Sequence, residues 1–258
     1  ENKMTEIVSA KTKLERWISN IKDIDKFINS SSLLKEHEFY IKEITNNSKH
    51  LLSESEETII SKMKNTGSSA WIKFKDNLVS NMQVQFRGER LPLTVILNKA
   101  YDEDKDVRKE AYEAEIASYK NVEDGIAATL NAIKGEVLNV CDLRKYESPL
   151  EMTLQISRMK KNELDAMFTA IKESLPIFRQ YLRRKAKMLE HKNGLPFYDL
   201  YAPVSKADMK FTYEEAMKFV YENFKTFSDD LASFAKKAFD NSWIDVKPRE
   251  GKVGGAFC

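Results

Sequence analysis

Residues that interrupt regular structure are scarce along almost the whole of this chain. Only 8 of its 258 residues are glycine and 6 are proline, and three of the glycines fall within the last eight positions. Glycine and proline are the residues least compatible with the interior of a helix, so their scarcity before that tail favours long helices. We therefore expect a mostly α-helical protein.

The overall composition restricts the environment and the partners. Hydrophobic residues make up 42% and charged residues 32%, as in globular rather than disordered proteins. A net charge of +2 predicts neither a nucleic-acid nor a membrane partner. No apolar run approaches the ~20 residues that cross a bilayer, and no signal-peptide pattern opens the chain. With only Cys141 and Cys258, far apart, we expect a reduced, cytoplasmic setting.

Two segments repeat apolar residues at the spacing of an amphipathic helix. One begins at Lys161, and the other begins at Thr212, which forms a capping-box pattern with Glu215. We expect one long helix from each, with its apolar stripe facing a core, and a kink or break at Pro176. The stripes are Leu164, Phe168, Ile171, Leu175, Phe178, Leu182 and Leu189 in the first segment and Tyr213, Ala216, Val220, Phe224, Phe227, Leu231, Phe234 and Ala238 in the second.

Shorter elements are expected between and after these helices. Residues 83–90 alternate polar and apolar side chains up to a glycine turn, which predicts a β-hairpin near residues 83–95. A helical stretch is predicted from residue 104 toward residue 140, with weaker continuity at its two glycines. Residues 195–204 contain two prolines and predict a loop or short turn. Short strands are expected near residues 243–257.

One segment begins like the zinc-peptidase motif His-Glu-x-x-His. That motif works because histidines four residues apart share a helix face and can both reach a metal ion. Here His37 and Glu38 are followed by Ile41 at the position of the second histidine. A single imidazole cannot hold zinc, so we expect an ordinary surface helix at this segment.

Two further charge patterns have a structural interpretation. The acidic spacing Asp102, Asp104, Asp106 and Glu113 matches a calcium-binding EF-hand loop, but Val107 stands where the turn needs glycine. We expect these acidic residues to favour a helix N-terminus instead. A basic cluster on one predicted helix comprises Arg179, Arg183, Arg184, Lys185 and Lys187. We expect it to form a solvated helix face, and the alternative is that it lines the wall of a peptide channel.

Four segments carry a more specific signal. They are DVRKEAY at residues 106–112, RKYESPL at 144–150, YDLYAP at 198–203 and PREGKVGGAFC at 248–258. In this order they resemble the oligoendopeptidase F branch of the thimet-oligopeptidase-like zinc peptidases, and the resemblance covers nearly the full chain. Within YDLYAP, Asp199 and Tyr201 are interpreted as structural residues that cap and pack the channel wall.

The resemblance implies an almost all-helical fold that encloses a deep channel, which admits short peptides and excludes folded proteins. In such families a His-Glu-x-x-His helix supplies two zinc ligands and the general base, and a later helix supplies a glutamate ligand. The resemblance implies that these elements follow the GGAF segment, so we expect a fragment that ends before them. No residue here is assigned as catalytic or as a metal ligand.

The resemblance also implies a domain division and one substrate-binding segment. Residues 1–96 would form the N-terminal helical region, and residues 97–258 the first, incomplete part of the peptidase domain. Adjacent glycines let a peptide backbone approach closely, and a strand edge can bind an extended substrate. The predicted substrate-binding residues are Gly254, Gly255, Ala256 and Phe257. The alternative is that the two glycines only relieve packing against a helix.

The expected function follows from the same resemblance. The complete enzyme would hydrolyse short peptides through a zinc-activated water, whereas this chain alone would bind no zinc and cleave nothing. The alternative is a helical scaffold or adaptor with vestigial peptidase ancestry. A His-Glu-x-x-His motif in the reading frame beyond Cys258 separates the two. Apolar faces left exposed would favour self-association.

Overall fold

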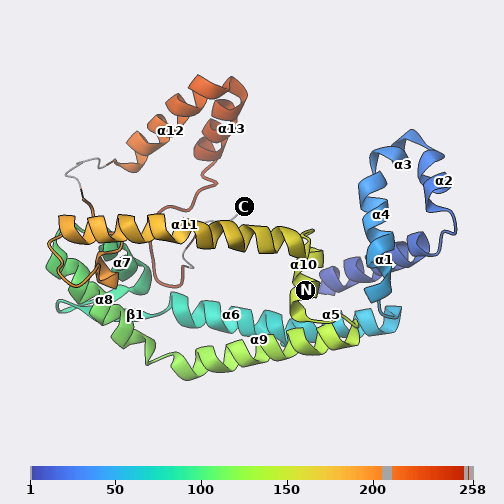
Figure 1. Ribbon diagram of the computed structural model, residues 1–258, viewed down its shortest axis with the longest axis horizontal. Helices are drawn as coiled ribbons and strands as arrows, with labels where there is room; N and C mark the ends of the chain where they lie inside the picture. The colour runs from blue at the N-terminus through green and yellow to red at the C-terminus, as the bar shows by residue number, and fades with distance from the viewer. Residues whose placement is uncertain (1, 205–210, 253–254, 256–258) are drawn as a thin grey trace. The chain divides into compact units, whose positions relative to one another are not determined.

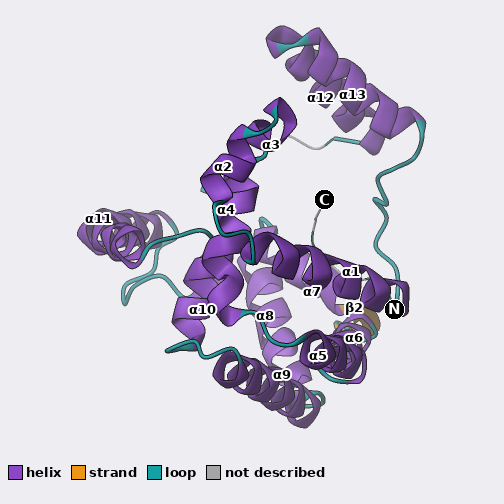
Figure 2. Ribbon diagram, turned by 90° about the vertical axis from the view of Figure 1, so that its right-hand side faces the viewer, coloured by secondary structure: helices purple, strands orange, loops and turns teal. Residues whose placement is uncertain are grey.

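The computed structural model describes residues 2–204, 211–252 and 255, which are mostly helical and include one two-stranded sheet (Figures 1 and 2). The predicted fold class is therefore confirmed. In chain order the elements are α1 Asn2–Ser19, α2 Ile24–Asn29, α3 Ser32–Glu36, α4 Glu38–Asn47, η1 Ser48–His50, α5 Glu54–Thr66, α6 Ser68–Ser80, β1 Gln83–Phe86, β2 Glu89–Pro92, α7 Leu93–Asn98, η2 Lys99–Tyr101, α8 Lys105–Tyr119, α9 Glu123–Leu143, α10 Pro149–Ile156, α11 Lys161–Met188, η3 Phe197–Asp199, α12 Tyr213–Phe227 and α13 Asp229–Asp240.

The chain divides into two compact units. Unit 1 comprises residues 1–79 and 119–177, and unit 2 comprises residues 80–118 and 178–258. Each unit is therefore assembled from two separate stretches of sequence. The predicted division at residues 96 and 97 follows the order of the sequence and remains a prediction.

A cluster of isoleucines forms the core of the first four helices in unit 1. Ile18, Ile28, Ile41 and Ile44 are all buried and in contact. Burying an aliphatic side chain of this size stabilises the fold by about 1.5–3 kcal/mol. Ile41 is the residue at the position of the second histidine in the partial zinc motif. Its burial in this core agrees with the structural interpretation of that segment.

Helix α9 runs antiparallel to α5 and α6 in unit 1. Near its start, a Cβ placed on Gly125 would lie only 3.0 Å from the Leu78 side chain, so this glycine permits close packing against α6. Near its middle, Glu136 accepts hydrogen bonds from the backbone N–H and the hydroxyl of Ser68, both at 2.7 Å. The helical stretch expected from residue 104 is interrupted between α8 and α9, before Gly125 rather than at a glycine.

Both capping boxes that the sequence predicted form at the N-termini of their helices. Ser53 accepts from the backbone N–H of Glu56 while the Glu56 carboxylate accepts from the backbone N–H of Ser53, which starts α5. The same reciprocal pair forms between Thr212 and Glu215 at the start of α12. Both capping boxes satisfy N–H groups that the first turn of a helix leaves free.

Helix α11 continues through Pro176 over 28 residues, so of the predicted kink or break the break does not occur, and the kink remains a prediction. The proline removes one backbone N–H donor, and the remaining turns of so long a helix keep their hydrogen bonds.

The predicted β-hairpin is confirmed. β1 and β2 pair antiparallel, with Phe86 opposite Glu89. Arg87 and Gly88 both have positive φ, at 49° and 89°, as the tightest hairpin turns require. Val84 and Phe86 are buried and the intervening Gln85 is exposed, which is the alternation that the sequence showed.

The strand expected near residues 243–246 is wrong. Residues 243–252 are described and contain no strand. Residues 243–251 are exposed, and among the described residues their backbone forms no strand pairing, although the Gly251 N–H donates to the Ser80 carbonyl at 3.1 Å. Most of the remaining predicted strand, at 253–254 and 256–257, lies outside the described residues.

The single long helix expected from residue 212 to residue 238 is also wrong. The chain breaks at Ser228, whose backbone is extended with φ −160° and ψ 128°. The Ser228 hydroxyl accepts from the backbone N–H of Leu231 and so caps the start of α13. The two helices lie side by side as a helical hairpin (Figure 1). Ser228 followed by two aspartates is the local signal for this start.

Candidate functional site

The predicted substrate-binding segment lies mostly outside the described residues. Gly254, Ala256 and Phe257 are not described, and only Gly255 is. Gly255 is exposed with φ +107°, and a Cβ added to it would meet no heavy atom within 4 Å. Its backbone conformation, rather than close packing, therefore requires glycine at this position. Substrate binding by the segment remains a prediction.

A buried ion pair holds the YDLYAP motif in unit 2. Asp199 is fully buried, and one of its carboxylate oxygens accepts from Arg108 Nε at 2.7 Å. Its other oxygen lies 2.5 Å from Nε2 of His191. Arg108 Nη1 also donates to the backbone carbonyls of Asp102 and Glu103, at 2.7 and 2.9 Å. The interaction ties two of the four resembling segments together and agrees with a structural role for Asp199, whose place in a channel wall remains a prediction.

Lys185 departs from the solvated face predicted for the basic cluster. Its side chain is buried, and its Nζ donates to the backbone carbonyl of Leu200 at 2.7 Å. Burial lowers the pKa of Lys185, although the nearby Asp199 carboxylate opposes this effect. The predicted exposed face holds for the other members, which are Arg179, Arg183, Arg184 and Lys187.

Aromatic rings surround a small pocket beside this buried pair. The pocket measures about 290 Å³. The rings of Tyr101 and Tyr201 lie 5.1 Å apart between centroids, and those of Tyr112 and Phe197 lie 5.8 Å apart. Tyr201 thus packs against Tyr101, in agreement with the predicted packing role. The pocket is apolar on its aromatic side and suits packing or the binding of an apolar group.

The acidic spacing that resembled an EF-hand serves the start of α8. The Asp102 carboxylate accepts from the backbone N–H of Asp104, and the Asp104 carboxylate accepts from the backbone N–H of Asp106. These are local turns that lead into the helix. The structural interpretation of this segment is confirmed.

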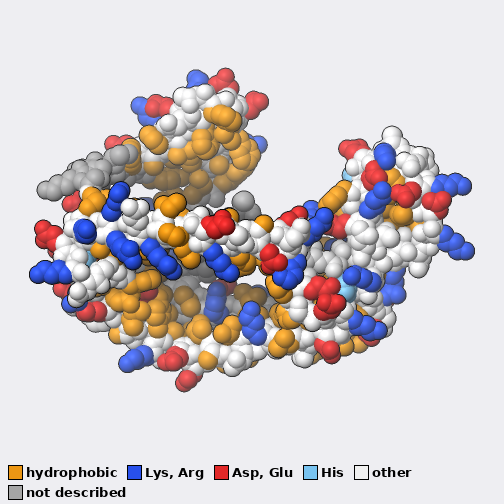
Figure 3. Space-filling view, viewed as in Figure 1, with side chains coloured by type: hydrophobic (Ala, Val, Ile, Leu, Met, Phe, Trp, Pro, Cys, Tyr) orange, Lys and Arg blue, Asp and Glu red, His pale blue; other side chains and the backbone are white. Residues whose placement is uncertain are grey.

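The apolar stripes of the long amphipathic helices are not covered, contrary to prediction. On α11, Phe168 and Phe178 are 49% and 60% exposed. On the helical hairpin, Phe227 and Phe234 are 85% and 64% exposed, and Figure 3 shows hydrophobic side chains gathered over α12 and α13. The described residues alone therefore leave apolar faces open, as expected for faces that other protein covers.

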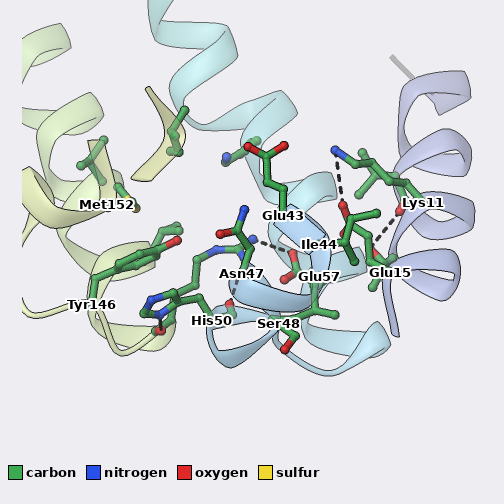
Figure 4. Close-up of a pocket in the computed structure, with 18 of the residues that line it drawn as sticks. Lys11, Glu15, Glu43, Ile44, Asn47, Ser48, His50, Glu57, Tyr146 and Met152 are labelled. Atoms are coloured by element: carbon green, nitrogen blue, oxygen red, sulfur yellow. Dashed lines mark hydrogen bonds and ion pairs between the residues drawn. The ribbon is translucent and has the colours of Figure 1, made fainter. Parts of the chain in front are cut away.

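A second pocket, of about 500 Å³, lies within unit 1 and is lined by α1, α4, α5, α9 and α10 (Figure 4). At one wall the Tyr146 ring stacks on His50, with 3.6 Å between centroids. Arg144 Nη2 donates to the Glu57 carboxylate at 2.6 Å, and Arg144 Nη1 donates to the His50 carbonyl at 3.2 Å. Nδ1 of His50 lies 2.8 Å from the Arg144 carbonyl.

Sequence reasoning did not identify this second cluster. His50 and Arg144 are 94 residues apart, and no spacing rule connects them. The only signal was indirect, because Arg144 and Tyr146 belong to the RKYESPL segment that resembles the peptidases.

The described side chains do not assemble a zinc site. Within residues 2–204, 211–252 and 255, no group of three or more His, Cys, Asp or Glu side chains could hold a metal ion. His191 is paired with Asp199, and His50 is stacked on Tyr146. Zinc in peptidases needs three protein ligands. The described residues therefore do not fit such a site.

Comparisons with known proteins identify the class to which this fold belongs. Residues 13–83 match the family described as Oligopeptidase F, and residues 99–258 match Peptidase family M3. The chain is 28% identical over 267 residues to oligopeptidase PepF of Bacillus subtilis, which covers 99% of this chain and 39% of that protein. It is 33% identical over 156 residues to the chromosomal oligoendopeptidase F of Lactococcus lactis subsp. cremoris, covering 60% and 26%.

A solved structure shows the same fold. The crystal structure of oligoendopeptidase-F from Enterococcus faecium superposes with a TM-score of 0.67 at 18% identity, covering 92% of this chain and 52% of that one. This chain belongs to peptidase family M3. It spans about two fifths of the length of the Bacillus subtilis relative. No helix in the described ranges has the length and apolar character needed to cross a membrane.

Proposed function

We propose that this chain forms the N-terminal region and the first part of the catalytic domain of a zinc-dependent oligoendopeptidase that hydrolyses short peptides. The match to Peptidase family M3 over residues 99–258 is the observation that carries this proposal. The separate match over residues 13–83 supports a boundary near residues 96 and 97. In the complete enzyme zinc would activate the attacking water.

Within that enzyme, the proposed role of this chain is architectural. The buried Arg108–Asp199 pair fixes the YDLYAP loop against α8, which is the kind of support that a channel wall needs. The open apolar faces of α11 and of the α12–α13 hairpin supply surface on which further protein could pack. We propose that the zinc ligands and the general base come from polypeptide outside this sequence, so that the chain alone is inactive.

The proposed substrate contact is the segment that includes Gly255. The exposed backbone and positive φ of Gly255 support it, because a side chain is absent where an extended peptide would approach. In the complete enzyme, Gly255→Ala should lower kcat/KM for short peptides. Gly194→Ala is the matched control, since Gly194 also has positive φ, at +101°, and open space around it.

The experiment that tests the proposed function uses the complete reading frame. It should contain a His-Glu-x-x-His motif beyond Cys258, and its product should cleave short peptides but not folded proteins, with loss of cleavage on chelation. A reading frame without such a motif, or cleavage that chelators leave unchanged, would overturn the proposal and favour a scaffold. A cytoplasmic location remains a proposal based on the cysteine content.

A further inference from the structure

The connection between α11 and η3 contains the only Asn-Gly pair of the sequence, Asn193 followed by Gly194. Asparagine is one of the chemically labile residues of proteins. The backbone nitrogen of the residue that follows it can attack the side-chain carbonyl carbon and close a cyclic succinimide. Glycine has no Cβ to obstruct this attack, and its backbone reaches conformations that other residues rarely adopt. The pair is therefore the position in the sequence that is best suited to deamidation.

The structure leaves both reacting groups of this pair free. Asn193 and Gly194 are exposed and lie outside any helix or strand. Among the residues that the structure describes, no hydrogen bond engages the Asn193 carboxamide or the backbone N–H of Gly194. Gly194 has φ +101°, and a Cβ added there would meet no heavy atom within 4 Å. Neither hydrogen bonding nor packing therefore protects the two groups.

The connection is anchored on both sides of the pair. Before it, the His191 N–H donates to the Ala186 carbonyl at 2.8 Å, and His191 Nε2 lies 2.5 Å from the Asp199 carboxylate. After it, the Asp199 N–H donates to the Pro196 carbonyl at 3.1 Å. A reaction at Asn193 therefore changes the connection between these anchors without first breaking either of them.

Asn241 provides a protected asparagine for comparison. It is also exposed, and the small residue Ser242 follows it. Its Nδ2 donates to the Lys237 carbonyl at 2.7 Å, and the Ser242 N–H donates to the Phe239 carbonyl at 3.0 Å. Both groups that would have to react are held, so deamidation of Asn241 requires these hydrogen bonds to break first. Hydrogen bonding, rather than exposure, distinguishes the two asparagines.

We propose that Asn193 is a site of spontaneous deamidation, which converts the α11–η3 connection into aspartate and isoaspartate forms. The Gly194 nitrogen bonds to Cγ of Asn193 while the Cγ–Nδ2 bond breaks, and Nδ2 leaves as ammonia with the proton from the Gly194 nitrogen. Water then opens the succinimide. Opening at Cγ gives aspartate, and opening at the backbone carbonyl gives isoaspartate, whose main chain passes through Cβ and Cγ. Water is consumed, ammonia is released, and nothing is oxidised or reduced.

The products change a segment that leads into the YDLYAP motif. Both products add a negative charge to the exposed connection, and isoaspartate also lengthens its main chain. The motif that follows is held against α8 by the Arg108–Asp199 pair. The reaction requires neither zinc nor peptide hydrolysis, so its test does not depend on the proposed function.

The test incubates the purified 258-residue chain at physiological temperature in mildly alkaline buffer, with and without concentrated guanidinium chloride. After a short digestion in acid, which suppresses the reaction, mass spectrometry follows the conversion of amide to acid at Asn193 and Asn241. Synthetic peptides identify the isoaspartate form by chromatography. In the folded chain, Asn193 should convert about tenfold faster than Asn241 or more, because two hydrogen bonds protect Asn241. Guanidinium chloride should accelerate Asn241 and leave the rate at Asn193 nearly unchanged.

Three variants separate the effect of sequence from that of structure. Asn193→Gln keeps an exposed carboxamide but would have to close a larger ring, so conversion at this position should be lost. Gly194→Ala places a Cβ beside the attacking nitrogen and should slow conversion severalfold. Ser242→Gly is the matched control, because it gives Asn241 a glycine neighbour at φ 54° and retains both protecting hydrogen bonds. Asn241 should remain slow in that folded variant.

Each outcome decides the proposal. Fast conversion of Asn193 in the folded chain, lost in Asn193→Gln and not matched by Asn241 in Ser242→Gly, supports it. Conversion of Asn193 that is no faster than that of Asn241, or that becomes fast only in guanidinium chloride, would overturn it. If a variant does not fold, the rates of the unmodified chain with and without guanidinium chloride still decide.

Discussion

Replacing Asp199 by alanine should destabilise unit 2 more than replacing any exposed carboxylate. Asp199 is fully buried and pairs with Arg108, which is itself 3% exposed. Removing one partner of a buried pair leaves the other charge without compensation, at a cost of about 3–5 kcal/mol. Arg108 keeps two backbone carbonyl acceptors, so we expect a loss of about 3 kcal/mol in the free energy of unfolding.

The assay is urea unfolding of the full chain, followed by circular dichroism and by tyrosine fluorescence. Glu110→Ala is the control, because Glu110 lies on α8 and pairs with Arg87 while both side chains are about half exposed. Exposed pairs contribute little, so this variant should unfold near the wild-type midpoint. The double variant Arg108→Met with Asp199→Leu should recover part of the loss. Equal destabilisation by Asp199→Ala and Glu110→Ala would refute the reasoning.

Three further predictions concern surface charge, capping and association. Hydrogen bonds from Lys35 and, to a smaller extent, Lys42 lower the pKa of Glu38 from 4.5 to about 2. The stabilising contribution of this carboxylate is therefore present above pH 4.5 and is lost as the pH falls from there to about 2. A carboxyl titration by NMR that gives an ordinary pKa for Glu38 would contradict this. Ser228→Ala removes the cap of α13 and should lower stability by about 1 kcal/mol in thermal unfolding, and an unchanged midpoint would argue against the cap. Phe227→Lys should reduce self-association in sedimentation, and association that the variant leaves intact would place the contact elsewhere.

Local features of the fold could be predicted from sequence because their causes are local. Both capping boxes need only two residues three positions apart, and both are present at Ser53 and Thr212. The β-hairpin likewise follows from alternation and one glycine turn. These patterns place the ends of elements without any knowledge of tertiary structure.

The break at Ser228 shows where periodicity fails. The apolar spacing continues through Phe224, Phe227 and Leu231, so a count of apolar positions predicts one helix. The serine and the two aspartates after it nevertheless start a new helix, because a capped N-terminus competes with the continuation of the first. The strand predicted from Trp243 is wrong for a related reason, because a sequence that favours an extended backbone does not by itself provide a neighbouring strand to pair with.

The candidate sites depend on contacts that are distant in sequence. Arg108 and Asp199 are 91 residues apart, and His50 and Arg144 are 94 residues apart. Charge patterns suggested a solvated face for Lys185, whereas burial against the Leu200 carbonyl could be seen only in three dimensions. Arg108 and Asp199 belong to two of the segments that resemble the peptidase family, but only the three-dimensional structure shows that their side chains form an ion pair.

The most direct test of the central claim is the zinc content of the purified 258-residue chain, measured together with cleavage of short peptides. We expect far less than one zinc per chain and no cleavage, because the described side chains do not assemble three metal ligands. One tightly bound zinc per chain, with cleavage that a chelator abolishes, would contradict the claim that this chain contributes architecture rather than the catalytic centre.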